Sequence, residues 1–130
     1  MPHVSTVIAR PWREVYAYAA DPANLPQWAA GLSTAELRPA GDGWWTATGP
    51  LGTVGVRFCE RNEFGVLDHV VRLPDGTEVL NPMRVVEWDG AAEVVFSVRP
   101  REGMTDADVQ ADAAAVATDL ATLKGVLESG

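Results

Sequence analysis

The chain has 130 residues, enough for one domain, and 47% of them are hydrophobic, which is ordinary for a globular protein. Its 18 acidic and 10 basic side chains give a formal net charge of −8, which repels the phosphate backbone that nucleic-acid-binding proteins neutralise with lysine and arginine. One cysteine and two histidines exclude an internal disulfide and leave no structural zinc spacing. We therefore expect a single domain over residues 1–130, with no metal, no cofactor and no nucleic-acid partner.

The sequence also predicts where the protein works. No apolar run approaches the roughly 20 residues that a membrane-spanning helix needs, and the N-terminus lacks the apolar core and cleavage site of a secretion signal. We expect a cytoplasmic protein that is not inserted in a membrane. Much of the negative charge falls in residues 106–112, which we interpret as a solvated helix face.

The first elements along the chain are predicted to be a strand and two short helices. Residues 3–9 are rich in β-branched side chains, and Pro11 suits the first turn of a following helix. Apolar side chains recur in that helix at helical spacing, at Trp12, Val15, Tyr16 and Ala19. Asp21 and Pro22 then supply an N-cap and a first turn for a second helix, which ends before Gly31.

The rest of the chain predicts strands followed by one long helix. Between residues 33 and 100, turn signals rich in glycine and proline separate six strand-like runs at the spacing of an antiparallel meander. Residues 104–129 predict a helix with Thr105 as N-cap and Asp108 at the capping-box position. One apolar stripe follows this helix, through Val109, Val116, Leu120, Leu123 and Leu127.

This order of elements is similar to the START-like helix-grip superfamily, also called SRPBCC or polyketide cyclase/dehydratase-like. The likeness spans nearly the whole chain. It is carried by RPWREVYAYAADPANLPQW (10–28), NEFGVLDH (62–69), NPMRV (81–85) and DLATLKGVLE (119–128), of which the last three resemble an uncharacterised bacterial subfamily. The resemblance implies an α+β fold in which a seven-stranded curved antiparallel sheet grips the C-terminal helix around a cavity for hydrophobic molecules, with two short helices between strands 1 and 2.

Members of the superfamily include aromatic polyketide cyclases, lipid and sterol carriers, plant hormone receptors, birch-pollen allergens and co-chaperone domains. One scaffold thus supports many activities, so the resemblance implies the fold and leaves the function to the site.

His69 interrupts the otherwise apolar face of the predicted strand 66–73. A buried histidine needs a polar partner, so its neighbours matter. A two-residue loop at residues 75–76 would place Pro82 opposite His69 and Arg84 diagonal to it. A four-residue loop at residues 62–65 would place Phe58 opposite His69 and Glu60 on the other diagonal.

The last hairpin allows two loop lengths. A two-residue loop at residues 89–90 would turn Glu93, Ser97 and Arg99 toward the face of Arg84. A three-residue loop at residues 89–91 would turn Val94, Phe96 and Val98 there instead. We favour the longer loop because burying each apolar side chain is worth roughly 1.5 to 3 kcal/mol. The predicted inner wall is Trp45, Val54, Val56, Phe58, Leu67, Val71, Leu80, Val86, Phe96 and Val98, with Glu60, His69 and Arg84 in its middle.

A ligand site follows from this wall. The predicted ligand-binding residues are Trp28, Trp45, Val56, Phe58, His69, Val71, Leu80, Arg84, Phe96, Val116 and Leu120. His69, Arg84 and Glu60 could orient a ligand, or as catalytic candidates share proton transfer in a cyclase-like reaction. Equally, His69 could simply be satisfied by water, a carboxylate or a backbone carbonyl. Arg84 would reach solvent if Pro82 inverts the strand alternation, as would Glu60 near a strand end.

Three functions remain open at this stage. We favour binding or transport of a small hydrophobic or aromatic ligand in a cavity between the sheet and the C-terminal helix. The first alternative is a polyketide cyclase/dehydratase-like enzyme that uses His69 and Arg84. The second is a co-chaperone-like interaction module, for which a filled interior without a pocket would be diagnostic. A homodimer through a sheet edge is compatible with all three.

Overall fold

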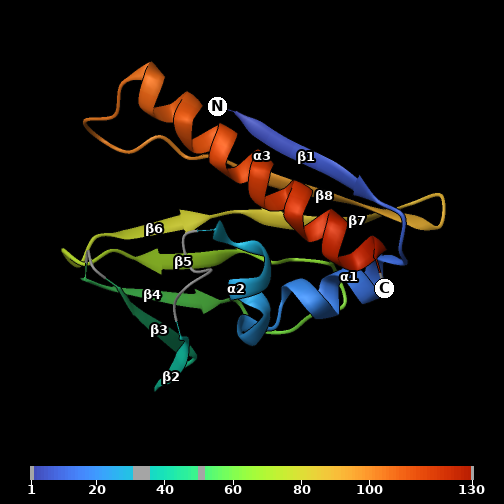
Figure 1. Ribbon diagram of the computed structural model, residues 1–130, viewed down its shortest axis with the longest axis horizontal. Coiled ribbons are helices and arrows are strands. Elements are labelled where there is room, and N and C mark those ends of the chain that lie inside the picture. Colours follow the sequence, from blue (N-terminus) through green and yellow to red (C-terminus); the bar gives the residue numbers. More distant parts are fainter. Residues whose placement is uncertain (1, 31–35, 50–51, 130) are drawn as a thin grey trace.

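The computed structural model describes residues 2–30, 36–49 and 52–129, which form a mixed α+β fold with a long C-terminal helix (Figure 1). One antiparallel sheet has the order β1-β8-β7, from His3–Ile8, Ala91–Ser97 and Met83–Trp88. The other has the order β2-β3-β4-β5-β6, from Arg38–Gly41, Trp44–Gly49, Gly52–Phe58, His69–Arg72 and Glu78–Asn81. The helices are α1 (Trp12–Ala19), the 3₁₀ turn η1 (Pro22–Asn24), α2 (Leu25–Trp28) and α3 (Asp106–Glu128).

The predicted single sheet of seven strands is wrong, because Pro82 divides one expected strand into β6 and β7. Proline has no N–H with which to continue a ladder. β6 therefore ends at Asn81 as a partner of β5, and β7 begins at Met83 as a partner of β8. The chain passes from one sheet to the other at this proline.

Backbone hydrogen bonds also tie β7 to residues 65–67, which lead into β5. The Leu67 N–H donates to the Met83 carbonyl at 2.8 Å, and the Val85 N–H donates to the Gly65 carbonyl at 2.8 Å. Gly65 has φ +75°, and a Cβ there would lie 2.1 Å from the Val85 oxygen. Only glycine permits this close approach, so the joint depends on residue 65.

The predicted helix ends are confirmed where local side chains specify them. The Thr105 side chain accepts from the Asp108 N–H while the Asp108 carboxylate accepts from the Thr105 N–H, which completes the capping box of α3. Asp21 caps η1 by accepting from the Ala23 N–H at 3.0 Å. Within the described residues, no helix is long and apolar enough to span a bilayer.

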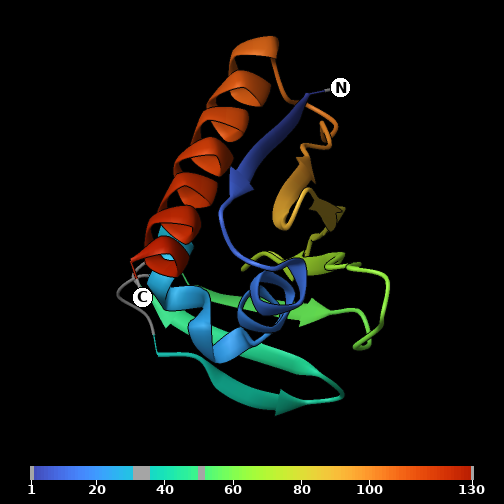
Figure 2. The ribbon, with the colours of Figure 1, turned by 90° about the vertical axis from the view of Figure 1, so that its right-hand side faces the viewer.

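Helix α3 runs along β1 in both views (Figures 1 and 2). It is held mainly near its carboxyl end. Its buried side chains, Leu120, Leu123 and Leu127, all lie in its second half. Near that end Lys124 Nζ donates to the Val7 carbonyl at 2.6 Å, and Glu128 accepts from the Ala9 N–H at 2.7 Å. The core packs these leucines with the buried residues of α1 (Val15, Tyr16 and Ala19) and the inner sides of β1, β7 and β8.

Candidate functional site

A pocket of about 380 Å³ lies between α3, α2 and the inner sides of β4, β5, β6 and β8. Apolar side chains form most of its lining: Leu25, Trp28, Ala29, Val54, Val56, Val71, Leu73, Val79, Phe96, Val98, Ala115, Val116 and Leu120. The polar or charged lining residues are His69, Asn81, Arg99, Arg101, Asp112 and Asp119. The pocket is thus an apolar space with a few polar groups at separate places.

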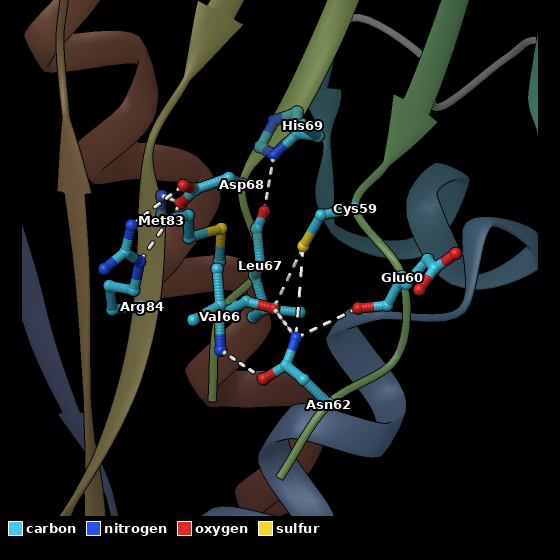
Figure 3. Close-up of polar contacts among 9 residues, drawn as sticks. All are labelled: Cys59, Glu60, Asn62, Val66, Leu67, Asp68, His69, Met83 and Arg84. Carbon is cyan, nitrogen blue, oxygen red and sulfur yellow. Dashed lines mark hydrogen bonds and ion pairs between the residues drawn. The ribbon is translucent and has the colours of Figure 1, made fainter. Parts of the chain in front are cut away.

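His69 is the buried ionisable side chain of this wall, with 8% of its surface exposed. Its ring lies between Phe58 and Phe96, with centroid distances of 4.9 and 5.9 Å. His69 Nδ1 lies 2.9 Å from the Leu67 carbonyl oxygen (Figure 3). Because a carbonyl only accepts, Nδ1 carries the proton and Nε2 keeps its lone pair. Burial lowers the pKa of His69 despite the opposing effect of the Leu67 hydrogen bond, so the ring is neutral at neutral pH.

The predicted inward orientation of Arg84 is wrong. Its guanidinium pairs with the Asp68 carboxylate, with Nε to Oδ1 at 3.1 Å and Nη2 to Oδ2 at 2.8 Å, away from His69 (Figure 3). Half of the Arg84 side chain is exposed. The inward-facing positions along β6 and β7 are the odd-numbered ones, with Val79 and Asn81 at the pocket and Met83 and Val85 buried, so Arg84 faces outward. Hydrogen bonding to Arg84 lowers the pKa of Asp68, which stays ionised.

Glu60 does not join His69 either. It lies beyond the end of β4 at Phe58, and it is exposed. Its backbone carbonyl accepts from the Asn62 side chain at 3.0 Å, and its carboxylate points away from His69 (Figure 3). The predicted three-residue cluster is therefore reduced to His69.

The hairpin between β5 and β6 has a different register from the one predicted. The Leu73 N–H donates to the Thr77 carbonyl, which closes a three-residue loop with Gly76 at φ +90°. His69 consequently pairs with Asn81 and not with Pro82. The predicted inward position of Leu80 is wrong, since its side chain is half exposed, and Val79 and Asn81 line the pocket instead.

The last hairpin has the two-residue loop, so our preference for three residues was wrong. Trp88 pairs with Ala91, and Asp89 and Gly90 have φ +48° and +79°. Phe96 still faces the pocket, because Met83 and not Arg84 is the inward residue of β7 and lies opposite it. The same one-residue shift of the inner face exposes half of Val86, which was predicted to face inward.

The other predicted ligand-binding residues fall into two groups. Those that line the pocket are Trp28, Val56, His69, Val71, Phe96, Val116 and Leu120. Trp45 pairs with Val56, and Phe58 pairs with His69, yet neither is among the lining residues. Trp28 is buried, and within the described residues its Nε1 has no hydrogen-bond partner. For both groups of residues, a part in ligand binding stays a prediction.

The charged lining residues were not predicted. Asp112 precedes Val116 by four residues and Asp119 follows it by three, so helical spacing could have placed both on the same face as Val116. Asp119 Oδ1 accepts from the Ala30 N–H at 3.1 Å, and burial raises its pKa. Asp112 pairs with Arg101 at 3.8 Å. Among the residues that the structure describes, no cluster of three or more His, Cys, Asp and Glu could hold a metal ion.

Comparisons with known proteins reveal likeness in structure alone. No protein-family model matches the sequence, and no curated protein matches it significantly. DynU16, a protein of the dynemicin biosynthetic locus, is 18% identical with a TM-score of 0.74 over 98% of this chain and 47% of its own. The chain thus spans about half the length of DynU16.

Two other solved structures match over nearly their full length. An uncharacterised protein from Bacillus thuringiensis is 14% identical, with a TM-score of 0.73 over 96% of each chain. Ara h 8.0201 is 13% identical, with a TM-score of 0.67 over 99% of this chain and 97% of its own. At such identities a likeness in structure shows the fold alone. The chain therefore has an α+β fold of the helix-grip kind, in which two antiparallel sheets meet a long C-terminal helix.

Proposed function

We propose that the protein binds a small hydrophobic or aromatic molecule in the pocket between α3 and the sheets. The observation that carries this proposal is an apolar pocket of about 380 Å³ with one buried, neutral imidazole in its wall. Sites for small molecules are typically concave and apolar, about 300 to 1,000 Å³ in volume, with a few polar groups that orient the ligand.

His69 is the group that would orient this ligand. Its Nδ1–H is held by the Leu67 carbonyl, and Phe58 packs against the ring, so the imidazole is fixed before a ligand arrives. Among the described residues none donates a hydrogen bond to Nε2. A ligand hydroxyl or N–H could therefore donate to this lone pair while the rest of the molecule contacts apolar side chains.

A polyketide cyclase-like activity receives less support. As a general base, His69 would become a buried cation, which is costly without a carboxylate in contact with the ring. Asp68 is adjacent in sequence, but its carboxylate is bound to Arg84 on the other side of the strand. Of the three predicted catalytic candidates only His69 reaches the pocket, and it is better suited to accept a hydrogen bond than a proton.

The interaction-module alternative is also less favoured. It predicts a filled interior, whereas the pocket is lined mostly by apolar side chains that face α3. A molecule that fills this space would bury apolar surface worth roughly 25 cal/mol per Å².

A pair of bulky substitutions tests the proposal. Val71→Trp fills the pocket from β5, whereas Leu80→Trp adds the same ring on β6 at a half-exposed position that faces away. The probe is N-phenyl-1-naphthylamine, an uncharged dye whose fluorescence rises in apolar surroundings. We expect wild type and Leu80→Trp to bind it alike, and Val71→Trp to bind at least tenfold more weakly.

The same titration can contradict the proposal. Equal binding by Val71→Trp and Leu80→Trp would mean that the dye sits elsewhere, and no binding by wild type would argue against a ligand pocket. Thermal unfolding of each variant checks that a loss of binding is not a loss of folding. Native mass spectrometry of freshly purified protein adds an independent readout, since a retained small molecule should be absent from Val71→Trp.

A further inference from the structure

We propose that the ligand of this pocket is amphipathic, with an anionic group such as a carboxylate held by Arg99 at the pocket rim. The rim is the part of the pocket formed by Arg99, Arg101 and Asp112. This inference rests on the proposed function and narrows its ligand class from hydrophobic molecules in general to apolar molecules that carry one acid group.

Arg99 differs from the other arginines in that it has no partner among the residues that the structure describes. Each of the others contacts a carboxylate or an aromatic ring. Within the described residues Arg99 has no hydrogen bond, ion pair or ring contact. In a chain with 18 acidic side chains and a net charge of −8, an uncompensated guanidinium beside an apolar pocket is a specific feature of the site.

Among the described residues, the carboxylates near the rim interact with Arg101 and not with Arg99. Arg101 pairs with Asp112 at 3.8 Å and also interacts with Asp75 in the β5–β6 turn. Asp119 is the remaining carboxylate of the lining. It lies seven residues beyond Asp112, about 10 Å further along the helix, and accepts from the Ala30 N–H. An anion at the rim would thus face Arg99 without lying against Asp119.

The rest of the pocket determines which way such a ligand lies. Arg99 follows Val98, whose side chain is 4% exposed and lines the pocket, so the arginine stem begins at the apolar wall. Among the described lining residues away from the rim, the polar groups are the neutral imidazole of His69, the Asn81 amide and the Asp119 carboxylate, and none is a cation. An acid group there would lose hydration without gaining a counter-charge. The apolar part therefore points inward and the anion stays at the rim, where the planar guanidinium can bind both oxygens of a carboxylate.

Two dyes with the same ring skeleton test separately whether the pocket binds a ligand and whether Arg99 binds its anionic group. N-phenyl-1-naphthylamine is uncharged, and 8-anilino-1-naphthalenesulfonate carries one added sulfonate. The variants are Arg99→Gln and, as a control with the same loss of charge, Arg38→Gln on β2, which pairs with Glu36 and does not line the pocket. Both variants should have the same midpoint of thermal unfolding as the wild-type protein.

We expect Arg99→Gln to bind the sulfonate dye about three- to tenfold more weakly and the uncharged dye within twofold of wild type. Arg38→Gln should change neither affinity. Raising NaCl from about 50 to 500 mM should weaken sulfonate binding in wild type and much less in Arg99→Gln, because screening acts on the lost contact. Dodecanoate and 1-dodecanol, used to displace the uncharged dye, should repeat this difference for a carboxylate.

The outcomes distinguish a failure of the proposed function from a failure of the role assigned to Arg99. If wild type binds neither dye, the proposed function fails. If wild type binds the uncharged dye normally but the sulfonate affinity is unchanged in Arg99→Gln, or falls equally in Arg38→Gln, the assignment of Arg99 is refuted and the proposed function stands. A loss confined to Arg99→Gln and to the two anionic ligands supports the amphipathic ligand.

Discussion

Lowering the pH from 7.5 to 5.5 should reduce the free energy of unfolding by about 1.4 kcal/mol through His69 alone. In the unfolded chain this histidine takes up a proton near its ordinary pKa of 6.5, whereas in the folded protein burial lowers the pKa. The unfolded state therefore binds more protons below pH 6.5, and stability falls as the pH falls. Above about pH 7.5 the ring is neutral in both states and contributes nothing.

The size of this loss in unfolding free energy is set by protonation of His69 in the unfolded chain. With an unfolded pKa of 6.5, the binding term RT ln(1 + 10^(pKa − pH)) rises by about 1.4 kcal/mol between pH 7.5 and 5.5 if the native ring stays unprotonated. The burial of the ring against Phe58 and Phe96 is the reason why it does, and this burial outweighs the hydrogen bond to the Leu67 carbonyl, which favours the protonated ring.

The assay is urea unfolding of wild type, His69→Gln and His3→Gln at both pH values. Groups other than the substituted histidine titrate alike in all three proteins, so their effects cancel in the comparison. Wild type and His3→Gln should lose about 1.4 kcal/mol more than His69→Gln on acidification. An equal loss in His69→Gln would refute the reasoning. Should that variant not fold, a pH titration of the wild-type His69 ring proton signals gives the same answer, since its midpoint should lie below the ordinary pKa of 6.5.

Two further predictions concern the frame of the pocket. Gly65→Ala should lower the free energy of unfolding, measured with urea, by at least about 3 kcal/mol, because its Cβ would meet the Val85 oxygen at 2.1 Å. Gly90→Ala, at φ +79°, meets no atom within 4 Å and should lower it by roughly 1 to 2 kcal/mol. Equal losses would mean that the backbone around Gly65 and Val85 can shift at little cost. In amide hydrogen exchange, residues 109–117 of α3 should exchange faster than residues 120–127, which include all its buried side chains, and uniform protection along the helix would contradict this.

Local signals made part of this structure predictable. The capping residues Asp21 and Thr105 specify helix starts through side chains a few residues away, and both were predicted. The four-residue loop at 62–65 likewise predicted the pairing of Phe58 with His69, and the alternation of β5 predicted that His69 faces inward. Each of these features depends on a short stretch of chain.

The errors arose where one residue more or fewer in a loop decides which way the side chains of a whole strand face. The β5–β6 loop has one residue more than predicted, which exchanges the two faces of the chain from Glu78 to Trp88 and turns Arg84 outward. The β7–β8 loop has one residue fewer than predicted, and this second shift of one exchanges the faces again for β8. For Phe96 the two loop errors cancelled, so the residue faced inward as predicted for the wrong reason, whereas Leu80 and Arg84 follow only the first loop and had no second error to correct them.

The charged residues of the pocket lay beyond prediction for another reason. The positions of Arg99 and Asp119 at the lining depend on how α3 lies across the sheets, and that is a property of packing between distant segments. The alanine-rich first half of α3 carries little information about its distance from the sheet.

Because α3 is held mainly at its carboxyl end, its amino-terminal half is the part that can move most easily to open the pocket. The helix is held at its carboxyl end by buried leucines and by hydrogen bonds to residues 7 and 9, while its amino-terminal half has no buried side chain. Swinging that half outward exposes little apolar surface, so it is the least costly way to uncover the pocket. For a ligand bound as proposed, the residence time would then depend on how often this half of the helix moves outward.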